Sequence, residues 1–364
     1  MTSRERIQAA LAHREPDRTP IFDYVLLSPI PDQLLGRPYR GYLYGDDERT
    51  FWRGLVEEAG WEGASRQVAR DMVDIACLLQ HDMMYVTPLP LLSPPRKGLT
   101  QSLAKCSDPV ERLRLRNDAV EAALAEPPAS ETDLLFIHVR EAMAERGVDL
   151  PILSPAYMHG VWTDVDLMQT MLLEPEVARR HFALATRRAL AAIERYLALG
   201  IEQIGIGGDF AGNRLLISPQ AYREFIVPEV RTLARRIHAA GAWAITASDG
   251  NLWPVIEEFL FGCEVDGYLE IDLHAGMELR QLKKSYGDRI TLYGNLDCGN
   301  ILSFGTVAEV RRHTLDCLEA GLGHGGHILC ASNAITASVP MRNYAAMVGA
   351  YREMFGLPAL RLSA

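Results

Sequence analysis

Acidic and amide side chains recur in the second half of the chain, each directly after a short apolar run. The residues in these places are Asp209 (IGIGGD), Asp249 and Asn251 (ITASDGN), Glu270 (YLE), Asn295 and Asp297 (YGNLD), and Ser332 and Asn333 (CASN). Carboxylates crowded into one cavity tend to have raised pKa values and can then hold a proton near neutral pH. Asp209, Asp249 and Glu270 are therefore predicted to be catalytic, and the other five residues to contact substrate.

Each of these positions also has a structural interpretation, because Asp, Asn and Ser cap helices and form Asx turns. Their corresponding places after consecutive apolar runs nevertheless favour one shared polar site. Tyr157 and His159 follow an earlier run that ends near Ala156, and both are predicted to contact substrate in the same site.

Other motifs give weaker signals. The segment GIGGDFAG does not fit the GxGxxG pattern of a nucleotide-binding loop, because Phe210 interrupts it. His324 and His327 lie three residues apart in a glycine-rich loop, where such histidines are more often solvated than bound to metal. Cys330 lies within an apolar strand and is best interpreted as a buried thiol. No metal site is predicted.

The apolar runs predict eight buried parallel strands, at residues 20–25, 83–87, 151–156, 203–208, 243–248, 267–271, 290–294 and 327–331. Segments with helical periodicity separate them, for example 175–198 and 219–240, which open with proline and close with glycine. This alternation predicts an α/β fold, a single (β/α)8 TIM barrel over residues 1–364 with an N-terminal helical and loop extension. Residues 28–64 are expected to form a loop-rich lid or insertion. In such a barrel, the polar residues after the strands face one mouth.

The composition excludes several classes of protein. The 364 residues carry a formal net charge of −10 and contain no Lys/Arg-rich run, which argues against a nucleic-acid partner. No stretch reaches the roughly 18 apolar residues of a membrane helix, and the N-terminus lacks an apolar signal region. The six cysteines are scattered without CxxC spacing, so a cytoplasmic location is expected.

Longer strings resemble the uroporphyrinogen decarboxylase superfamily. They include RERIQAALAHREPDRTP, GDFAGNRLLISPQAYREF, SDGNLWPVIEEFL, LYGNLDCGNIL and GGHILCASNAITAS, in the order and spacing typical of that superfamily. The resemblance covers nearly the whole chain. It implies one (β/α)8 barrel with its active site at the carboxyl ends of the strands.

Two branches of the superfamily fit the sequence poorly. In the decarboxylases, an early Asp and a late His act on the substrate, and these positions fall on Leu89 and Asn333. In the methyltransferases that act on coenzyme M, zinc is held by a His-x-Cys pair and a later Cys. The corresponding positions are Ala247, Asp249 and Asn333, so the resemblance makes zinc unlikely here.

A third branch is most similar, because it reads His-Ser-Asp-Gly-Asn at residues 247–251 and Ser-Asn-Ser-Ile at residues 332–335, where this chain has Ala247 and Ala334. That branch includes cobalamin-dependent methyltransferases of ether demethylation. The resemblance implies transfer of a methyl group from a small, methoxylated donor to a corrinoid on a partner protein, and it allows a homodimer. Two alternatives stay open: a decarboxylase or other lyase acting on a small acid, and a small-molecule or corrinoid binder without catalysis.

Overall fold

The computed structural model describes residues 1–27, 29–40, 48–90 and 97–360. Seven strands are assigned to a parallel sheet in the order in which they occur in the chain. They are β1 Met84–Tyr85, β2 Ile152–Met158, β3 Gln203–Gly207, β4 Trp243–Ala247, β5 Gly267–Leu269, β6 Thr291–Tyr293 and β7 His327–Ile328. Each lies within or overlaps a predicted apolar run, which confirms a parallel α/β fold.

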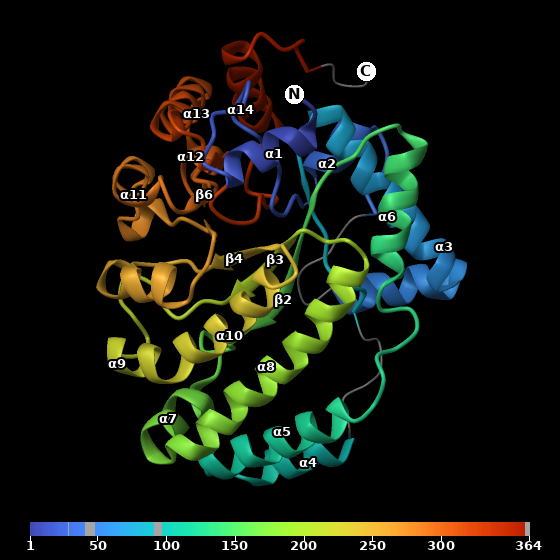
Figure 1. Cartoon of the computed structure of the whole chain (residues 1–364). Coiled ribbons are helices and arrows are strands. Elements are labelled where there is room, and N and C mark those ends of the chain that lie inside the picture. The colour runs from blue at the N-terminus through green and yellow to red at the C-terminus, as the bar shows by residue number, and fades with distance from the viewer. Residues whose placement is uncertain (28, 41–47, 91–96, 361–364) are drawn as a thin grey trace. The chain divides into compact units, whose positions relative to one another are not determined.

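The chain divides into two compact units. Unit 1 comprises residues 1–90, 131–154 and 267–364, and unit 2 comprises residues 91–130 and 155–266. The helices of unit 1 are α1 Ser3–Leu11, α2 Ile30–Leu35, α3 Glu48–Leu79, α6 Leu134–Glu145, α11 Leu279–Tyr286, α12 Ile301–Phe304, α13 Val307–Gly321 and α14 Met341–Met354, with a short 3-10 turn, η4 Leu273–Ala275. In this unit α3 packs on α6, and α13 packs on α14 (Figure 1).

Strand pairing in unit 1 places the loops after β5, β6 and β7 at one edge. Tyr268 of β5 pairs with Leu292 of β6, and Tyr293 of β6 pairs with Ile328 of β7. These strands are fully buried, as expected for parallel strands covered on both faces. Because the strands are parallel and in register, the loops that follow them leave the sheet side by side.

The first predicted strand, residues 20–25, forms isolated bridges in unit 1 instead of a full strand. Ile21 bridges to Leu329 and Leu26 bridges to Ile335, both in parallel orientation. On its other side, the carbonyl of Ile21 accepts a hydrogen bond of 2.8 Å from the amide of Asp82, just before β1. The segment thus lies between the chain around β7 and the chain before β1, where an eighth strand is expected. Pro20 has no amide hydrogen to donate, which limits the ladder at its start.

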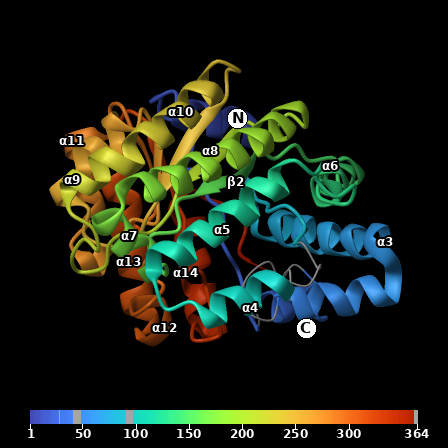
Figure 2. The same cartoon turned by 90° about the horizontal axis from the view of Figure 1, so that it is seen from below.

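Unit 2 contains α4 Lys97–Lys105, α5 Pro109–Leu124, α7 Val165–Leu173, α8 Pro175–Ala198, α9 Pro219–Ala221, α10 Val227–His238, the π-helical turns η1 Tyr222–Ile226 and η3 Glu258–Gly262, and the 3-10 turn η2 Trp253–Val255. Helix α5 packs on α7 and α8 (Figure 2). Helix α8 has the predicted bounds, with Pro175 in its first turn. Strands β3 and β4 pair in parallel, with Gln203 opposite Trp243.

The N-terminal region contains more helix than expected. The segment 28–64, expected to be rich in loops, contains α2 and the first half of α3, although residues 28 and 41–47 lie outside the described part. Helix α1 is capped by Thr2, which forms a capping box with Glu5. Within the described residues, no helix combines the length and apolar character needed to cross a membrane.

Candidate active site

The two aspartates after β3 and β4 lie next to each other in unit 2. The carboxylate of Asp209 accepts a hydrogen bond of 2.8 Å from the backbone amide of Asp249. Burial raises the pKa of Asp209, and hydrogen bonds from Asp249 and Ser248 only partly offset this effect. A carboxyl group in this environment can remain protonated at higher pH than an exposed one. Asp209 therefore has the properties expected of a general acid.

The backbone around this pair is tightly packed. A Cβ atom on Gly250 would lie 2.5 Å from the carbonyl carbon of Ala211, and Gly250 has a φ of +92°. Only glycine fits such a close approach with positive φ. The amide of Asn251 also donates to the carbonyl of Gly212, at 2.7 Å. The turn after β4 is thus held directly against the loop that carries Asp209.

Replacing Gly250 with alanine is therefore expected to destabilise unit 2 by about 2–3 kcal/mol, through strain at positive φ and the clash with Ala211. The matched control is Gly241→Ala, which has a φ of +74° but no atom within 4 Å of the added Cβ. It should cost about 1 kcal/mol. Urea unfolding of both variants measures the difference, and equal losses would show that the close approach to Ala211 is unimportant.

The predicted residues Tyr157, within β2, and His159, directly after it, are buried in unit 2. His159 is held by its Nδ1, which accepts from the amide of Val161 at 3.3 Å, and burial lowers its pKa to about 4. Its ring lies 5.8 Å from that of Phe210 and 6.5 Å from that of Tyr157. Burial also raises the pKa of Tyr157. At neutral pH both side chains are therefore uncharged, and His159 carries its proton on Nε2.

Asn251, the other predicted residue in unit 2, has a local structural role. Its side-chain carbonyl accepts from the amide of Trp253 at 3.2 Å, which forms the turn that opens η2. This contact is an Asx turn, one of the structural roles expected for Asn at such a position. Asn251 thus shapes the loop next to Asp249.

In unit 1 the loops after β5 and β6 are joined by a carboxylate–imidazole pair. Asp297, 2% exposed, lies 2.8 Å from Nε2 of His274, and it also accepts from the amides of Asn300 and Ile301 at the start of α12. Nε2 of His274 also lies 2.6 Å from Nδ2 of Asn300. His274 is half exposed and was not identified from the sequence, although it follows the predicted strand 267–271 by three residues.

The other predicted residues of unit 1 are bound into the same loops. Asn295 donates to the carbonyl of Met277 at 3.3 Å, and the amide of Asp297 donates to Nε2 of His313 at 2.9 Å. Glu270 follows β5 directly and has a φ of +69°, an uncommon backbone conformation for a residue with a side chain.

The loop after β7 holds the last two predicted residues. The hydroxyl of Ser332 lies 3.5 Å from Sγ of Cys298, and the side chain of Asn333 accepts from the amide of Ala334 at 2.6 Å. The histidine of β7, His327, is buried and lies 2.7 Å from the carbonyl of Gly294, so it is not solvated as its glycine-rich surroundings suggested.

No group of three or more His, Cys, Asp or Glu side chains in the described part of the chain is arranged to hold a metal ion. No disulfide joins any of the six cysteines, all of which lie in the described part of the chain.

Residues 151–354, more than half of the chain, match the family model of uroporphyrinogen decarboxylase (URO-D). The chain belongs to the uroporphyrinogen decarboxylase family. The match includes β2 to β7 and every predicted site residue. The site loops of this URO-D family member thus all lie within the residues that match the family model.

Relatives of this URO-D family member include enzymes of two kinds. A methylated-thiol–coenzyme M methyltransferase from Methanosarcina mazei is 26% identical over 192 residues, which span 53% of this chain and only 47% of that protein. A uroporphyrinogen decarboxylase from Coxiella burnetii is 22% identical over 282 residues, 72% of this chain and 74% of the relative. The solved structure of a methyltransferase from Methanosarcina mazei shares the fold, with a TM-score of 0.66 and 16% identity over 98% of this chain and 99% of that one.

Proposed function

We propose that this protein is a methyltransferase that moves a methyl group from a small, methoxylated donor to a corrinoid carried by a partner protein. The observation that carries the proposal is the half-buried carboxyl of Asp209, which accepts a hydrogen bond of 2.8 Å from the amide of Asp249 and has a pKa raised by desolvation. Methyl transfer in general is supported by the methyltransferase relative, and an acid at this place suits an oxygen leaving group.

The residues of unit 2 supply what such a reaction needs from the protein. The corrinoid supplies the nucleophile that accepts the methyl group. As the bond between methyl and oxygen breaks, negative charge develops on the oxygen, and a positioned acid lowers the barrier by donating a proton. Asp209 is the proposed donor. Asp249 fixes the Asp209 carboxylate through its amide, and its own carboxylate is the second proposed acid.

The surface beside Asp209 is suitable for a partner that brings a large apolar cofactor. Met158, Trp162 and Leu216 of unit 2 are exposed, with Trp162 at 49%. A Cβ atom added to Gly212 would lie 4.0 Å from the ring of Trp162, and the amide of Leu216 donates to the carbonyl of Phe210 at 2.8 Å. Large exposed apolar side chains of this kind are candidate contacts for a partner protein. They would provide contact area for the corrinoid protein.

The other predicted residues are proposed to contact or orient the donor. Glu270, Tyr157, His159, Ser332 and Asn333 are proposed to contact it. Asn251 and Asp297 bind backbone groups of their own loops, and Asn295 binds a carbonyl of the loop after β5, so their proposed contribution includes keeping those loops in place. No step is assigned to zinc, because the residues at the three ligand positions do not suit it. We also propose that the protein acts in the cytoplasm, consistent with six cysteines that form no disulfide.

Free reduced cobalamin and a panel of methoxylated aromatic compounds test the proposal. The full chain is expected to produce the absorbance of methylated cobalamin with at least one donor, together with the demethylated product. Consumption of an acid substrate without any change in the cobalamin spectrum would contradict the proposal and favour a lyase. Donor binding without turnover, even when a corrinoid protein is added, would contradict it and favour a binding protein.

A further inference from the structure

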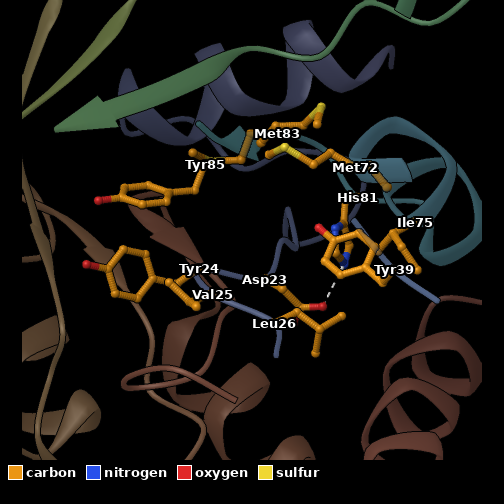
Figure 3. Close-up of a pocket in the computed structure, with 12 residues that line it drawn as sticks. Asp23, Tyr24, Val25, Leu26, Tyr39, Met72, Ile75, His81, Met83 and Tyr85 are labelled. Carbon is orange, nitrogen blue, oxygen red and sulfur yellow. Dashed lines mark ion pairs between the residues drawn. The ribbon is translucent and has the colours of Figure 1, made fainter. Parts of the chain in front are cut away.

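A small pocket in unit 1 lies apart from the residues assigned above. It is formed by residues 23–26, Tyr39, one face of α3, His81 and residues 83–85, and its volume is about 50 Å³ (Figure 3). The face of α3 contributes Met72, Ile75 and Ala76, all buried. Most of the wall is therefore apolar, and the charged groups in it are few.

One of these groups is the carboxylate of Asp23, whose side chain is only 9% exposed. Its Oδ2 accepts a hydrogen bond of 2.6 Å from the hydroxyl of Tyr344 and lies 3.4 Å from Nε2 of His81. The latter distance is longer than a normal hydrogen bond. No described residue donates a hydrogen bond to its second oxygen, Oδ1. Figure 3 shows Asp23 facing His81 beside the ring of Tyr39.

His81 does not neutralise this carboxylate. Burial lowers the pKa of His81, so the imidazole is uncharged at neutral pH in spite of the neighbouring Asp23 and Asp82. The arginines that influence His81 are engaged elsewhere. Arg18 binds Asp82 and Tyr351, and Arg352 donates to the carbonyls of Leu78 and Pro358. Neither arginine lines the pocket.

A buried carboxylate without a bonded cation is energetically costly. The cost falls if a positively charged ligand binds to its open oxygen. The size of the pocket limits that ligand to a few non-hydrogen atoms, because dry cavities that bind benzene are about three times larger, roughly 150 Å³. The ring of Tyr39, which lines the same pocket, adds a surface that attracts cations. The apolar walls suit a methyl group better than they suit a fully hydrated ion.

We propose that this pocket binds a small organic ammonium ion of the methylammonium class. Its N–H groups donate to Oδ1 of Asp23, and its methyl group packs against Met72 and Ile75. The proposal is independent of the methyltransferase reaction, since it concerns none of the residues assigned to that reaction. The main alternative is an ordered water molecule that satisfies Asp23, for which the volume also suffices.

Titration of the full chain with methylammonium chloride, followed by calorimetry at constant ionic strength, tests the proposal. Saturable binding is expected, and Asp23→Asn should weaken it by about tenfold or more, because the charge-assisted hydrogen bond is lost while the shape is kept. The exposed carboxylate of Asp288 provides the matched control, and Asp288→Asn should leave the affinity unchanged.

Two further measurements separate the ligand class from its alternatives. Ala76→Leu fills the pocket without removing the carboxylate, so it should abolish binding even if Asp23→Asn fails to fold. Methanol is a neutral probe of the same size, and it should bind at least about tenfold more weakly than methylammonium. Absence of saturable binding would overturn the proposal in favour of a water-filled pocket. Equal affinity for methanol, or no effect of either substitution, would also overturn it.

Discussion

Replacing Asp209 with asparagine is expected to lower turnover by about 100-fold or more, because the proton donor for the leaving oxygen is lost. Asparagine retains a carbonyl oxygen that can accept the 2.8 Å hydrogen bond from the amide of Asp249. The loop should therefore keep its conformation while the acid is removed. Formation of methylated cobalamin from a methoxylated donor measures the loss.

Turnover in the same reaction is expected to decrease as the pH rises. Asp209 must be protonated to act, and its pKa is raised by burial, so turnover should decrease as the pH rises through that raised pKa. Between the ordinary and the raised pKa the folded state binds more protons than the unfolded state, so Asp209 makes folding less favourable as pH increases. Asp209→Asn should remove the decrease of turnover with pH. Its melting temperature at neutral pH should be unchanged or higher.

Asp118→Asn provides the control for this experiment. Asp118 is also in unit 2, but its side chain is 64% exposed and pairs with Arg180 at the surface. Its replacement should leave turnover unchanged, since exposed ion pairs contribute little. If Asp209→Asn retained full turnover, Asp209 would be reassigned to holding the amide of Asp249, and Asp249 would become the remaining candidate for the acid.

The strands were predictable because buried parallel strands leave a simple sequence pattern, a short apolar run between turn residues. Helix α8 was predictable for a similar reason, since Pro175 marks its start. The segment 219–240 was not fully predictable, because its helical pattern is interrupted by the π turn Tyr222–Ile226. Pro228 lacks the amide hydrogen that a regular helix needs at that point, and the wider turn just before it accommodates this loss.

The candidate site was predictable in its location along the chain but not in its contacts. Residues after parallel strands gather at one edge of a sheet, which placed Asp209 next to Asp249 in unit 2. The pair of His274 and Asp297 was missed, because two residues 23 positions apart in different loops meet only when both loop conformations are known. Asp23 was missed for the same reason, since Tyr344 and His81 come from distant parts of the chain.

Replacing Asp82 with asparagine is expected to destabilise the protein by about 3–5 kcal/mol, the largest loss of stability anticipated here. Asp82 is completely buried and binds two arginines, Arg6 at 2.6 Å and Arg18 at 2.8 Å, whose side chains are only 7% and 12% exposed. Asparagine would leave both guanidinium groups buried without their shared counter-ion. Urea unfolding of the full chain measures the change.

The loss should be large because Asp82 connects three separate segments of unit 1. Besides binding the two arginines, Asp82 accepts hydrogen bonds from the hydroxyl of Ser3 at 3.1 Å and from the amide of Ile21 at 3.1 Å. It therefore joins α1 and the bridging segment, residues 20–25, to the start of β1. Asp149→Asn is the control, since Asp149 pairs with Arg4 at the surface with its side chain 65% exposed, and its replacement should cost about 1 kcal/mol or less. A similar small cost for Asp82→Asn would mean that water or neighbouring carboxylates compensate the arginines, and that the bridging segment is held by its backbone hydrogen bonds alone.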